Sequence, residues 1–507
     1  MAVNVNDEYN VKIQSVSSDG NGVARIDGMA VFVPFTAAGD EARIRIERVK
    51  KSYAEGRLLE LIVPSPDRIA PDCPHYMLCG GCALRHIKYE KQLVIKKEIV
   101  ENAMRRIGGF KDFTCEEIIG MENPSRYRNK TVFHADKNGV GFYSQKSHAV
   151  IPVTDCAIGA EENAAITKIA AQCGADSVFT RKSFSTGEIA VAVTAKDADK
   201  AELINSLTAA CKDVSGIFLN GEKIYGQDTI TDTLCGIKFK ISPESFFQVN
   251  PVQTEVLYAK ALEYAAVDNT KTVLDVYCGI GTISLCAAKM AKHVIGVEIV
   301  EKAIEDAKEN ARLNNIANAD FYAGSAERIV PMLIGNGERP DVVILDPPRR
   351  GSDEKTLAAI VKAKPERVVY VSCNPSTLAR DARYLADNGY KIERAAAVDL
   401  FPHTHHIETV VQLSQRKPDD VIKVQLDTDD LMLTSTEAKA TYEEIKTYVK
   451  RAFGLKVSSL YIAQVKKKLG LPMGKNYNIG KEGAHVPICP PEKEEAITEA
   501  LKHFKMI

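Results

Sequence analysis

The sequence predicts a multidomain protein with a small β-barrel, a central α+β domain, an α/β domain and a small helical C-terminal extension. A length of 507 residues exceeds what a single hydrophobic core supports. Short β-type runs separated by glycine turns fill the first part of the chain, whereas strands alternate with helices from residue 241, as in a doubly wound, mostly parallel sheet. We place the domains at residues 1–64, 65–240, 241–416 and 417–507.

Composition narrows the class of protein. Hydrophobic residues make up 45% and charged residues 26%, which is ordinary for a globular chain, and no apolar run could cross a bilayer. The N-terminal segment lacks the features of a secretory signal, so we expect a cytoplasmic protein without a membrane partner. The cytoplasm is a reducing compartment, so the 12 cysteines indicate metal ligation or catalysis, not disulfides. The net charge of −1 leaves nucleic-acid binding open, because polyanions respond to local clusters of cations.

The N-terminal segment is predicted to be an OB-like barrel. Residues 9–63 contain five short β-type runs at the spacing and size of a small RNA-binding module. One of these strands and its exit are basic, which suits either RNA contact or a solvated face: Arg43, Arg45, Arg48, Lys50 and Lys51. After this barrel, apolar positions at helical spacing predict one long helix over residues 88–108.

Four cysteines follow the barrel in a pattern that suits metal binding. Cys73, Cys79 and Cys82 lie within ten residues, and Cys156 follows on a later segment. Four thiolates form a standard structural zinc set, and they equally suit a [4Fe–4S] cluster. The spacing alone leaves both groups open.

The α/β domain carries a ligand-binding pattern. Asp275 ends an apolar strand, and Gly279 and Gly281 lie in the turn that opens the next helix, where backbone can approach a ligand closely. Glu298 ends the following strand, where a carboxylate can accept both ribose hydroxyls. Residues 346–349 (DPPR) form a rigid loop at the carboxyl edge, where open α/β sheets bind ligands. A glycine pair alone also suits a dinucleotide fold, but the whole set is typical of a class I (Rossmann-like) S-adenosylmethionine methyltransferase.

A cysteine at the same edge suggests the reaction. Cys373 ends the fifth strand, and the turn residues after it favour exposure over structural burial. Uracil C5 is a weak nucleophile, but thiolate addition at C6 gives C5 carbanion character. A base must then remove the C5 proton, and Glu408 is the candidate. Three histidines nearby keep a metal site open as the alternative, and otherwise shape the pocket or contact phosphate: His403, His405 and His406.

Six segments together resemble the RNA m5U (uracil-5-)-methyltransferase family: residues 246–250, 275–282, 296–298, 346–349, 372–381 and 401–410. The resemblance covers roughly residues 9–414 and is nearest to members with an N-terminal TRAM domain that act on 23S ribosomal RNA. It implies that Cys373 is the nucleophile, that Glu408 is the base and that the four cysteines hold a [4Fe–4S] cluster. It also implies the residues that contact the cofactor: Gln248, Tyr277, Gly279, Thr282, Glu298 and Asp346.

Two basic segments are predicted to contact RNA. Arg126, Arg128 and Lys130 surround Tyr127, a composition that can hold phosphate and stack bases, or that forms a solvated turn. Residues 441–481 hold nine Lys or Arg against two Glu, which indicates a winged-helix-like RNA-binding unit or a protein-docking module.

The expected function is methylation of C5 of one uridine in 23S ribosomal RNA by a monomeric enzyme. The uracil must leave its stack to reach Cys373, so single-stranded or loop RNA is the expected substrate. Within the same chemistry the alternatives are the T-loop uridine of transfer RNA and a pair of ribosomal uridines. The cysteine set and barrel favour ribosomal RNA, because the bacterial transfer-RNA enzyme resembles a shorter branch without a cluster. An exocyclic-amino methylase and a noncatalytic RNA-binding assembly factor are the alternatives from other classes.

Overall fold

A computed structural model describes residues 3–145, 147–153, 155–243, 245–416, 441–471, 489–504 and 506–507. The chain divides into two compact units, Met1–Asp420 and Val421–Ile507. The predicted boundary at residue 417 and two cations of the basic segment, Lys475 and Lys481, lie outside the described residues. In the part of the chain that the structure describes, no helix is long and apolar enough to cross a membrane.

The N-terminal strands pack around one apolar core, as expected from their alternating sequence. Ala42, Ile44 and Ile46 on one strand face inward and are fully buried. Arg43 and Arg45 face outward between them, where they pair with glutamates on neighbouring strands. The strands run in the order β1-β5-β6-β4-β3-β2. Their bounds are β1 (Glu8–Lys12), β2 (Ser15–Val16), β3 (Gly22–Ile26), β4 (Met29–Val33), β5 (Glu41–Val49) and β6 (Tyr53–Val63).

The predicted long helix and a central mixed sheet follow. The helix is α1 (Tyr89–Arg106). The central sheet has the order β10-β9-β8-β11-β12-β13-β14, and α2 and α3 cover its apolar face. Its elements are β8 (Lys130–Asp136), β9 (Gly139–Tyr143), β10 (Val150–Pro152), α2 (Asn163–Gln172), β11 (Ala175–Lys182), β12 (Ile189–Ala195), α3 (Lys200–Ala210), β13 (Val214–Leu219) and β14 (Glu222–Gly226).

The α/β domain is built on an eight-stranded sheet with the order β19-β18-β17-β20-β21-β23-β22-β7. The strands from β19 to β21 are parallel, and β23 lies antiparallel between β21 and β22. The strands of the domain are β17 (Thr272–Val276), β18 (His293–Glu298), β19 (Ala319–Ala323), β20 (Val342–Leu345), β21 (Arg367–Ser372), β22 (Tyr390–Val398) and β23 (Glu408–Gln415).

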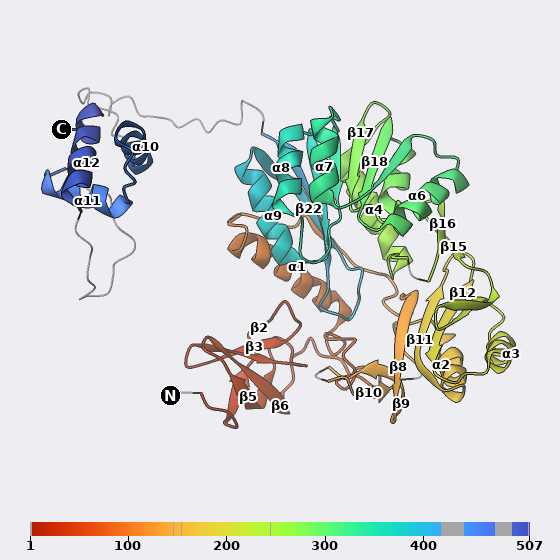
Figure 1. The fold of residues 1–507 in the computed structure, drawn as a ribbon. Coiled ribbons are helices and arrows are strands. Elements are labelled where there is room, and N and C mark those ends of the chain that lie inside the picture. Colours follow the sequence, from red (N-terminus) through yellow and green to blue (C-terminus); the bar gives the residue numbers. More distant parts are fainter. Residues whose placement is uncertain are drawn as a thin grey trace. The chain divides into compact units, whose positions relative to one another are not determined.

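Helices cover both faces of this sheet, which confirms the doubly wound prediction (Figure 1). One face carries α4 (Pro251–Ala265), α5 (Thr282–Ala288) and α6 (Glu301–Leu313). The other carries α7 (Ala326–Gly335), α8 (Glu354–Ala363) and α9 (Pro375–Asp387), together with the C-terminal part of α1. The strands are buried on both faces and therefore read as continuous apolar runs such as Val342–Leu345.

Two elements from the range 65–240 pack with the α/β domain instead of the central sheet. Strand β7 (Glu117–Ile119) pairs in parallel with β22 and forms the edge of the eight-stranded sheet. The hairpin of β15 (Ile230–Leu234) and β16 (Ile237–Ile241) buries its alternating apolar side chains in the core beside α4 and α5. Strand partners depend on tertiary packing, so local sequence did not reveal these attachments.

The second unit is helical in its described residues. Its helices are α10 (Tyr442–Phe453), α11 (Ser459–Lys468) and α12 (Pro491–His503), and they share one apolar core. Thr441 and Glu444 form a capping box that starts α10, and Gly454 ends it in the left-handed region with a φ of 70°.

Candidate active site

Adjacent antiparallel strands bring Cys373 and Glu408 together. Ser372, the last residue of β21, pairs with Thr409 on β23. Cys373 follows Ser372 and Glu408 precedes Thr409, so the two side chains start from opposite positions on neighbouring strands, with Cα atoms about 5 Å apart. The structure therefore places the predicted thiol and carboxyl at one edge of the sheet.

The protein environment favours the neutral forms of both groups. Glu408 is only 4% exposed, and burial, with a smaller effect of Asp346, raises the pKa of its carboxyl well above the usual range. Burial also raises the pKa of the Cys373 thiol to about 11, and the nearby Glu408 and Asp346 carboxyls add to the shift. The Arg349 guanidinium opposes both shifts, because a nearby cation favours the ionised forms.

Arg349 is held next to this pair. Its Nη2 lies 3.2 Å from Nε2 of His406, and its carbonyl oxygen accepts a hydrogen bond from Asn374 Nδ2 at 3.0 Å. Burial lowers the pKa of the three histidines, to about 3 for His406 and about 4 for His403. They are therefore neutral at physiological pH. His405 and His406 can exchange hydrogen bonds with a phosphate without adding charge, whereas His403 is buried and its ring lies against Gln92.

Two aspartates lie at the carboxyl ends of neighbouring strands. Asp346 follows β20 and Asp275 lies within β17. Burial raises the pKa of each carboxyl to about 7, although Ser284 on α5 donates a hydrogen bond to Asp275 and favours its ionised form. Carboxyls with a pKa near 7 can become ionised beside a bound cation.

The glycine turn after β17 is held by Glu298. The Gly279 amide donates a hydrogen bond to Glu298 Oε2 at 3.2 Å, and the Val300 amide donates one to Oε1 at 3.0 Å. Gly281 has a φ of 83°, and a Cβ there would lie 3.2 Å from Phe321, so glycine is required. The turn therefore has a fixed conformation at the N-terminus of α5.

Two other predicted cofactor residues adjoin this turn, and Gln248 lies before α4. Tyr277 precedes it with a φ of 73°, which is strained for a tyrosine, and its hydroxyl lies 3.1 Å from Ser352 Oγ. Thr282 begins α5, and its hydroxyl lies 2.9 Å from that of the buried Tyr258. Gln248 is mostly buried, at the start of the segment that leads into α4.

A cavity of about 690 Å³ opens at Cys373 between three parts of the first unit. The cavity is lined by the sheet edge around Cys373 and His406, by the C-terminal half of α1 and by the N-terminal strands. Local sequence did not reveal the contribution of α1 and the barrel, because neither carries a motif for it. Charged, polar and aromatic side chains from these two parts line the cavity: Arg25, Phe32, Glu98, Asn102 and Arg106.

The four predicted ligand cysteines line one cavity of about 270 Å³: Cys73, Cys79, Cys82 and Cys156. Burial raises the pKa of Cys82 to about 12, and the other three thiols add to the shift because they lie close by. A bound cation reverses such a shift, so the donor set suits a metal centre. Among the described residues, however, no group of three or more His, Cys, Asp or Glu side chains could hold a single metal ion.

The predicted RNA-binding segment lies next to this cavity. Arg126 donates hydrogen bonds to the Asp155 carboxylate and, at 2.8 Å, to the Cys156 carbonyl. Arg128 and Lys130 line the cysteine cavity itself. The expectation that Tyr127 stacks on bases is wrong: it is 1% exposed, and its hydroxyl donates to the Pro402 carbonyl at 3.0 Å.

The fold and the site define a class I methyltransferase that uses S-adenosylmethionine. The profile of the tRNA (uracil-5-)-methyltransferase family matches residues 201–416, and that of the TRAM domain matches residues 2–59. An RNA methyltransferase of Halalkalibacterium halodurans is 43% identical over 447 residues, which cover 81% of this chain and 98% of the relative. One of Clostridium tetani is 42% identical over 448 residues, which cover 81% and 97%. The chain therefore belongs to the RNA (uracil-5-)-methyltransferase family.

A solved structure matches most of the chain. The tRNA (uracil-54, C5)-methyltransferase of Pyrococcus abyssi, in complex with S-adenosyl-L-homocysteine, is 27% identical and has a TM-score of 0.65. The match covers 80% of this chain and 100% of that one.

Proposed function

We propose that the protein methylates C5 of a specific uridine in 23S ribosomal RNA, as a monomer, with Cys373 as nucleophile and Glu408 as base. The observation that carries the proposal is the cross-strand placement of these two side chains beside Asp346 and Arg349. No other pair of reactive groups is needed for this chemistry.

The residues act in sequence. The Cys373 thiol gives its proton to solvent, with Arg349 favouring the thiolate, and as Sγ forms a bond to uracil C6 the C5–C6 π electrons move to C5 as an enolate. S-adenosylmethionine would supply the electrophilic methyl group that this C5 takes, with S-adenosylhomocysteine as the leaving group. Glu408 then removes the C5 proton, and the electrons of that C–H bond form the C5–C6 double bond as the C6–S bond breaks. The high pKa of Glu408 makes its ionised form a strong base.

The cofactor is assigned to the glycine turn and the strand ends beside it. Glu298 lies where a carboxylate can accept ribose hydroxyls, and Asp346 can face the cationic end of the donor. The remaining contacts are proposed from the sequence motifs: Gln248, Tyr277, Gly279 and Thr282.

We test the mechanism with labelled S-adenosylmethionine and ribosomal RNA. Cys373→Ala should abolish both methylation and the covalent enzyme–RNA adduct. Glu408→Gln should still form the adduct and transfer methyl, but it should fail to release product, so the adduct accumulates on a denaturing gel. Undiminished C5 methylation by Cys373→Ala would refute the proposed mechanism.

We also propose that the four cysteines hold a [4Fe–4S] cluster. The observation that supports a metal centre is that the four thiols share one cavity. The choice of an iron–sulfur cluster over zinc follows from the family resemblance, because four thiolates suit either group. Iron and sulfide analysis tests this assignment, and stoichiometric zinc without sulfide would overturn it.

The choice of RNA needs a direct test. The Pyrococcus abyssi enzyme, whose name specifies transfer RNA, matches this architecture along its whole length, so the architecture alone does not exclude transfer RNA. We propose ribosomal RNA because of the cysteine set. Mapping 5-methyluridine in ribosomal and transfer RNA from cells with and without the gene decides between them. Loss of the T-loop modification would favour transfer RNA as the substrate. Loss of 5-methyluridine at two ribosomal sites would show that the enzyme modifies a pair of ribosomal uridines.

Two surfaces are proposed to bind this RNA. Arg128 and Lys130 lie beside the cysteine cavity, whereas Arg126 mainly holds the Cys156 segment. The second unit adds basic residues on α10 and α11, including Lys450 and Lys467. Removing residues 421–507 should weaken RNA binding and reduce its salt dependence if this unit contributes phosphate contacts.

A further inference from the structure

The loop between β22 and β23 is held by an unusual set of hydrogen bonds. Five consecutive carbonyl groups, from residue 399 to residue 403, each accept a hydrogen bond from a donor outside the loop. The donors, in loop order, are Gln253 Nε2 (3.2 Å), Asn250 Nδ2 (3.0 Å), Lys96 Nζ (3.0 Å), Tyr127 Oη (3.0 Å) and the amides of Ala83 (3.1 Å) and Leu84 (2.9 Å).

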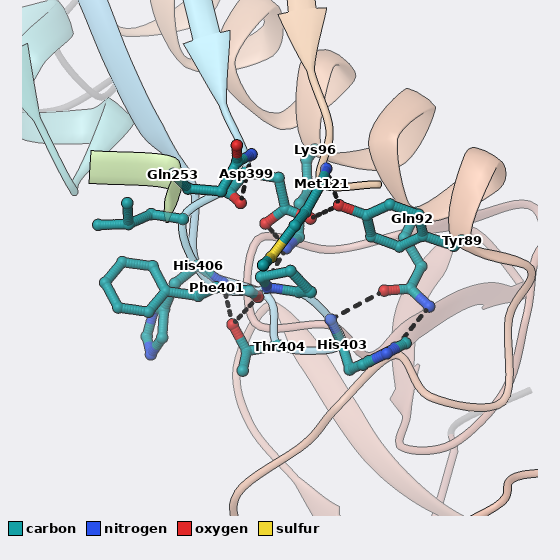
Figure 2. Close-up of polar contacts among 12 residues, drawn as sticks. Tyr89, Gln92, Lys96, Met121, Gln253, Asp399, Phe401, His403, Thr404 and His406 are labelled. Carbon is teal, nitrogen blue, oxygen red and sulfur yellow. Dashed lines mark hydrogen bonds and ion pairs between the residues drawn. The ribbon is translucent and has the colours of Figure 1, made fainter. Parts of the chain in front are cut away.

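A buried ion pair lies at the start of this loop. Lys96 on α1 and Asp399 are both 0% exposed, and Lys96 Nζ lies 2.6 Å from Asp399 Oδ1 (Figure 2). The Tyr89 hydroxyl donates to Asp399 Oδ2 at 3.0 Å, and Lys96 also donates to the Phe401 carbonyl. The pair therefore ties α1 to both a side chain and a peptide of the loop.

The far end of the loop is fixed by the same helix. Gln92, one turn before Lys96 on α1, accepts a hydrogen bond from the His403 amide at 3.1 Å, and its Nε2 lies 3.2 Å from His403 Nδ1 (Figure 2). His403 has a φ of 68°, which is costly for a residue with a Cβ. These contacts hold the loop in a conformation that its own sequence disfavours.

The pair lies next to the proposed base. Val398, the last residue of β22, is the cross-strand partner of Glu408, and Asp399 follows Val398 directly. A shift of Asp399 therefore changes the backbone that pairs with the base.

Stability alone is a poor explanation for this arrangement. Burial disfavours the charged amine and lowers the pKa of Lys96, while Asp399 opposes that shift. Removing two charges from water usually costs about as much as their attraction returns, and apolar replacements of similar volume are often neutral or stabilising. What the ion pair supplies that apolar groups cannot is a directional bond to the loop.

We propose that Lys96 and Asp399 are positioning residues that hold Glu408 where it can remove the C5 proton. The inference rests on the proposed roles of Cys373 and Glu408. Thiolate addition and methyl transfer depend on Cys373 after β21 and on the proposed cofactor residues, whereas product release depends on the base. Loss of the pair should therefore slow release more than methyl transfer, and the methylated covalent adduct should accumulate.

The test uses the full-length protein, ribosomal RNA and labelled S-adenosylmethionine. Lys96→Met and Asp399→Asn each break the pair, and the double variant Lys96→Met/Asp399→Leu removes it without leaving a buried charge. Lys91→Met is the matched control, because Lys91 lies on the same helix in a surface ion pair with Asp67 at 3.3 Å. Single-turnover methyl transfer, product release and adduct on a denaturing gel are measured for each.

We expect the double variant to stay folded, with a loss of roughly 1–3 kcal/mol of stability because the Phe401 carbonyl loses its donor. It should release product roughly 10- to 100-fold more slowly, because small displacements of a reacting group have effects of this size. Methyl transfer should change by less than about threefold, and adduct should accumulate as in Glu408→Gln. The Lys91→Met control should show neither effect.

The outcomes separate the two proposals. If Glu408→Gln accumulates adduct but the folded double variant releases product at the normal rate, the positioning role is refuted and the proposed function stands. If Glu408→Gln does not accumulate adduct, the base assignment itself fails. Equal losses of methyl transfer and release in the double variant would indicate general disruption and would also overturn the positioning role.

Discussion

Replacing Asp346 by Asn should stabilise the ligand-free protein at alkaline pH and weaken its binding of S-adenosylmethionine. Burial raises the pKa of the Asp346 carboxyl from the usual 3.8 to about 7, with a smaller effect of Asp275. Ionisation of this side chain in the folded protein is therefore unfavourable. An isosteric amide removes that cost, but it also removes the negative charge that can face a sulfonium.

The sign follows from the direction of the shift. Below pH 4 Asp346 is protonated in both folded and unfolded chains. Between pH 4 and about 7, ionisation of this carboxyl stabilises the unfolded chain, whereas the carboxyl in the folded protein stays protonated. The free energy of unfolding therefore falls across this range and stays constant above it. Three pKa units correspond to roughly 4 kcal/mol. Because the side chain keeps some solvent contact, we expect roughly half of that.

Two measurements check this prediction. The difference in denaturation midpoint between Asp346→Asn and the unmodified protein should be larger at pH 8 than at pH 5. The affinity of the unmodified protein for S-adenosylmethionine should weaken roughly tenfold from pH 8 to pH 6, as Asp346 becomes protonated. S-adenosylhomocysteine is the matched control ligand, because it lacks the sulfonium charge and should show a smaller dependence.

A particular result would refute this reasoning. The carboxylate does not face the sulfonium if two results are found together. One is that the affinities for S-adenosylmethionine and S-adenosylhomocysteine fall in parallel between pH 8 and pH 6, and the other is that Asp346→Asn weakens the binding of both ligands equally. Equal stability differences at pH 5 and pH 8 would show instead that Asp346 ionises at its usual pH in the folded protein.

Three further predictions concern single positions. Cys156→Ser should reduce bound iron and broad visible absorption, and unchanged iron would remove this cysteine from the ligand set. Tyr127→Phe should destabilise the protein by roughly 1–3 kcal/mol, because the buried Pro402 carbonyl loses its donor, while RNA affinity measured by filter binding stays constant. Gly281→Ala should weaken S-adenosylmethionine binding by calorimetry, because a φ of 83° strains alanine by roughly 1–2 kcal/mol and its Cβ approaches Phe321. Unaltered binding would show that the turn adapts.

The position of Cys373 could be predicted because it lies at a strand end. Apolar runs marked the parallel strands, and the residues after them had to meet at one edge of the sheet. Glu408 instead begins β23, and the antiparallel pairing of β23 with β21, which the sequence did not reveal, places it opposite Cys373. The glycine turn was predictable for a similar reason, since Gly281 needs a conformation that other residues disfavour.

Contacts between distant segments could not be predicted in this way. Lys96 and Asp399 are 303 positions apart, and each alone resembles an ordinary charged residue on an amphipathic element. Tyr127 was misinterpreted because its neighbours are cationic, whereas its own side chain is buried against Pro402. The composition of a short segment describes the solvent-facing residues around a side chain. It does not reveal which backbone group that side chain contacts in the folded protein.

These distant contacts also determine which parts of the chain make up the catalytic unit. Residues 241–416 contain the glycine turn, Cys373 and Glu408, but the donors to the carbonyls of Phe401, Pro402 and His403 all lie before residue 130. Strand β7, which covers the edge of β22, also precedes this range. Without these segments, buried carbonyls would lose their partners at a cost of roughly 1–3 kcal/mol each. The loop between β22 and β23 therefore depends on the helix and the cysteine segment that precede the α/β domain, because those segments complete its hydrogen bonds.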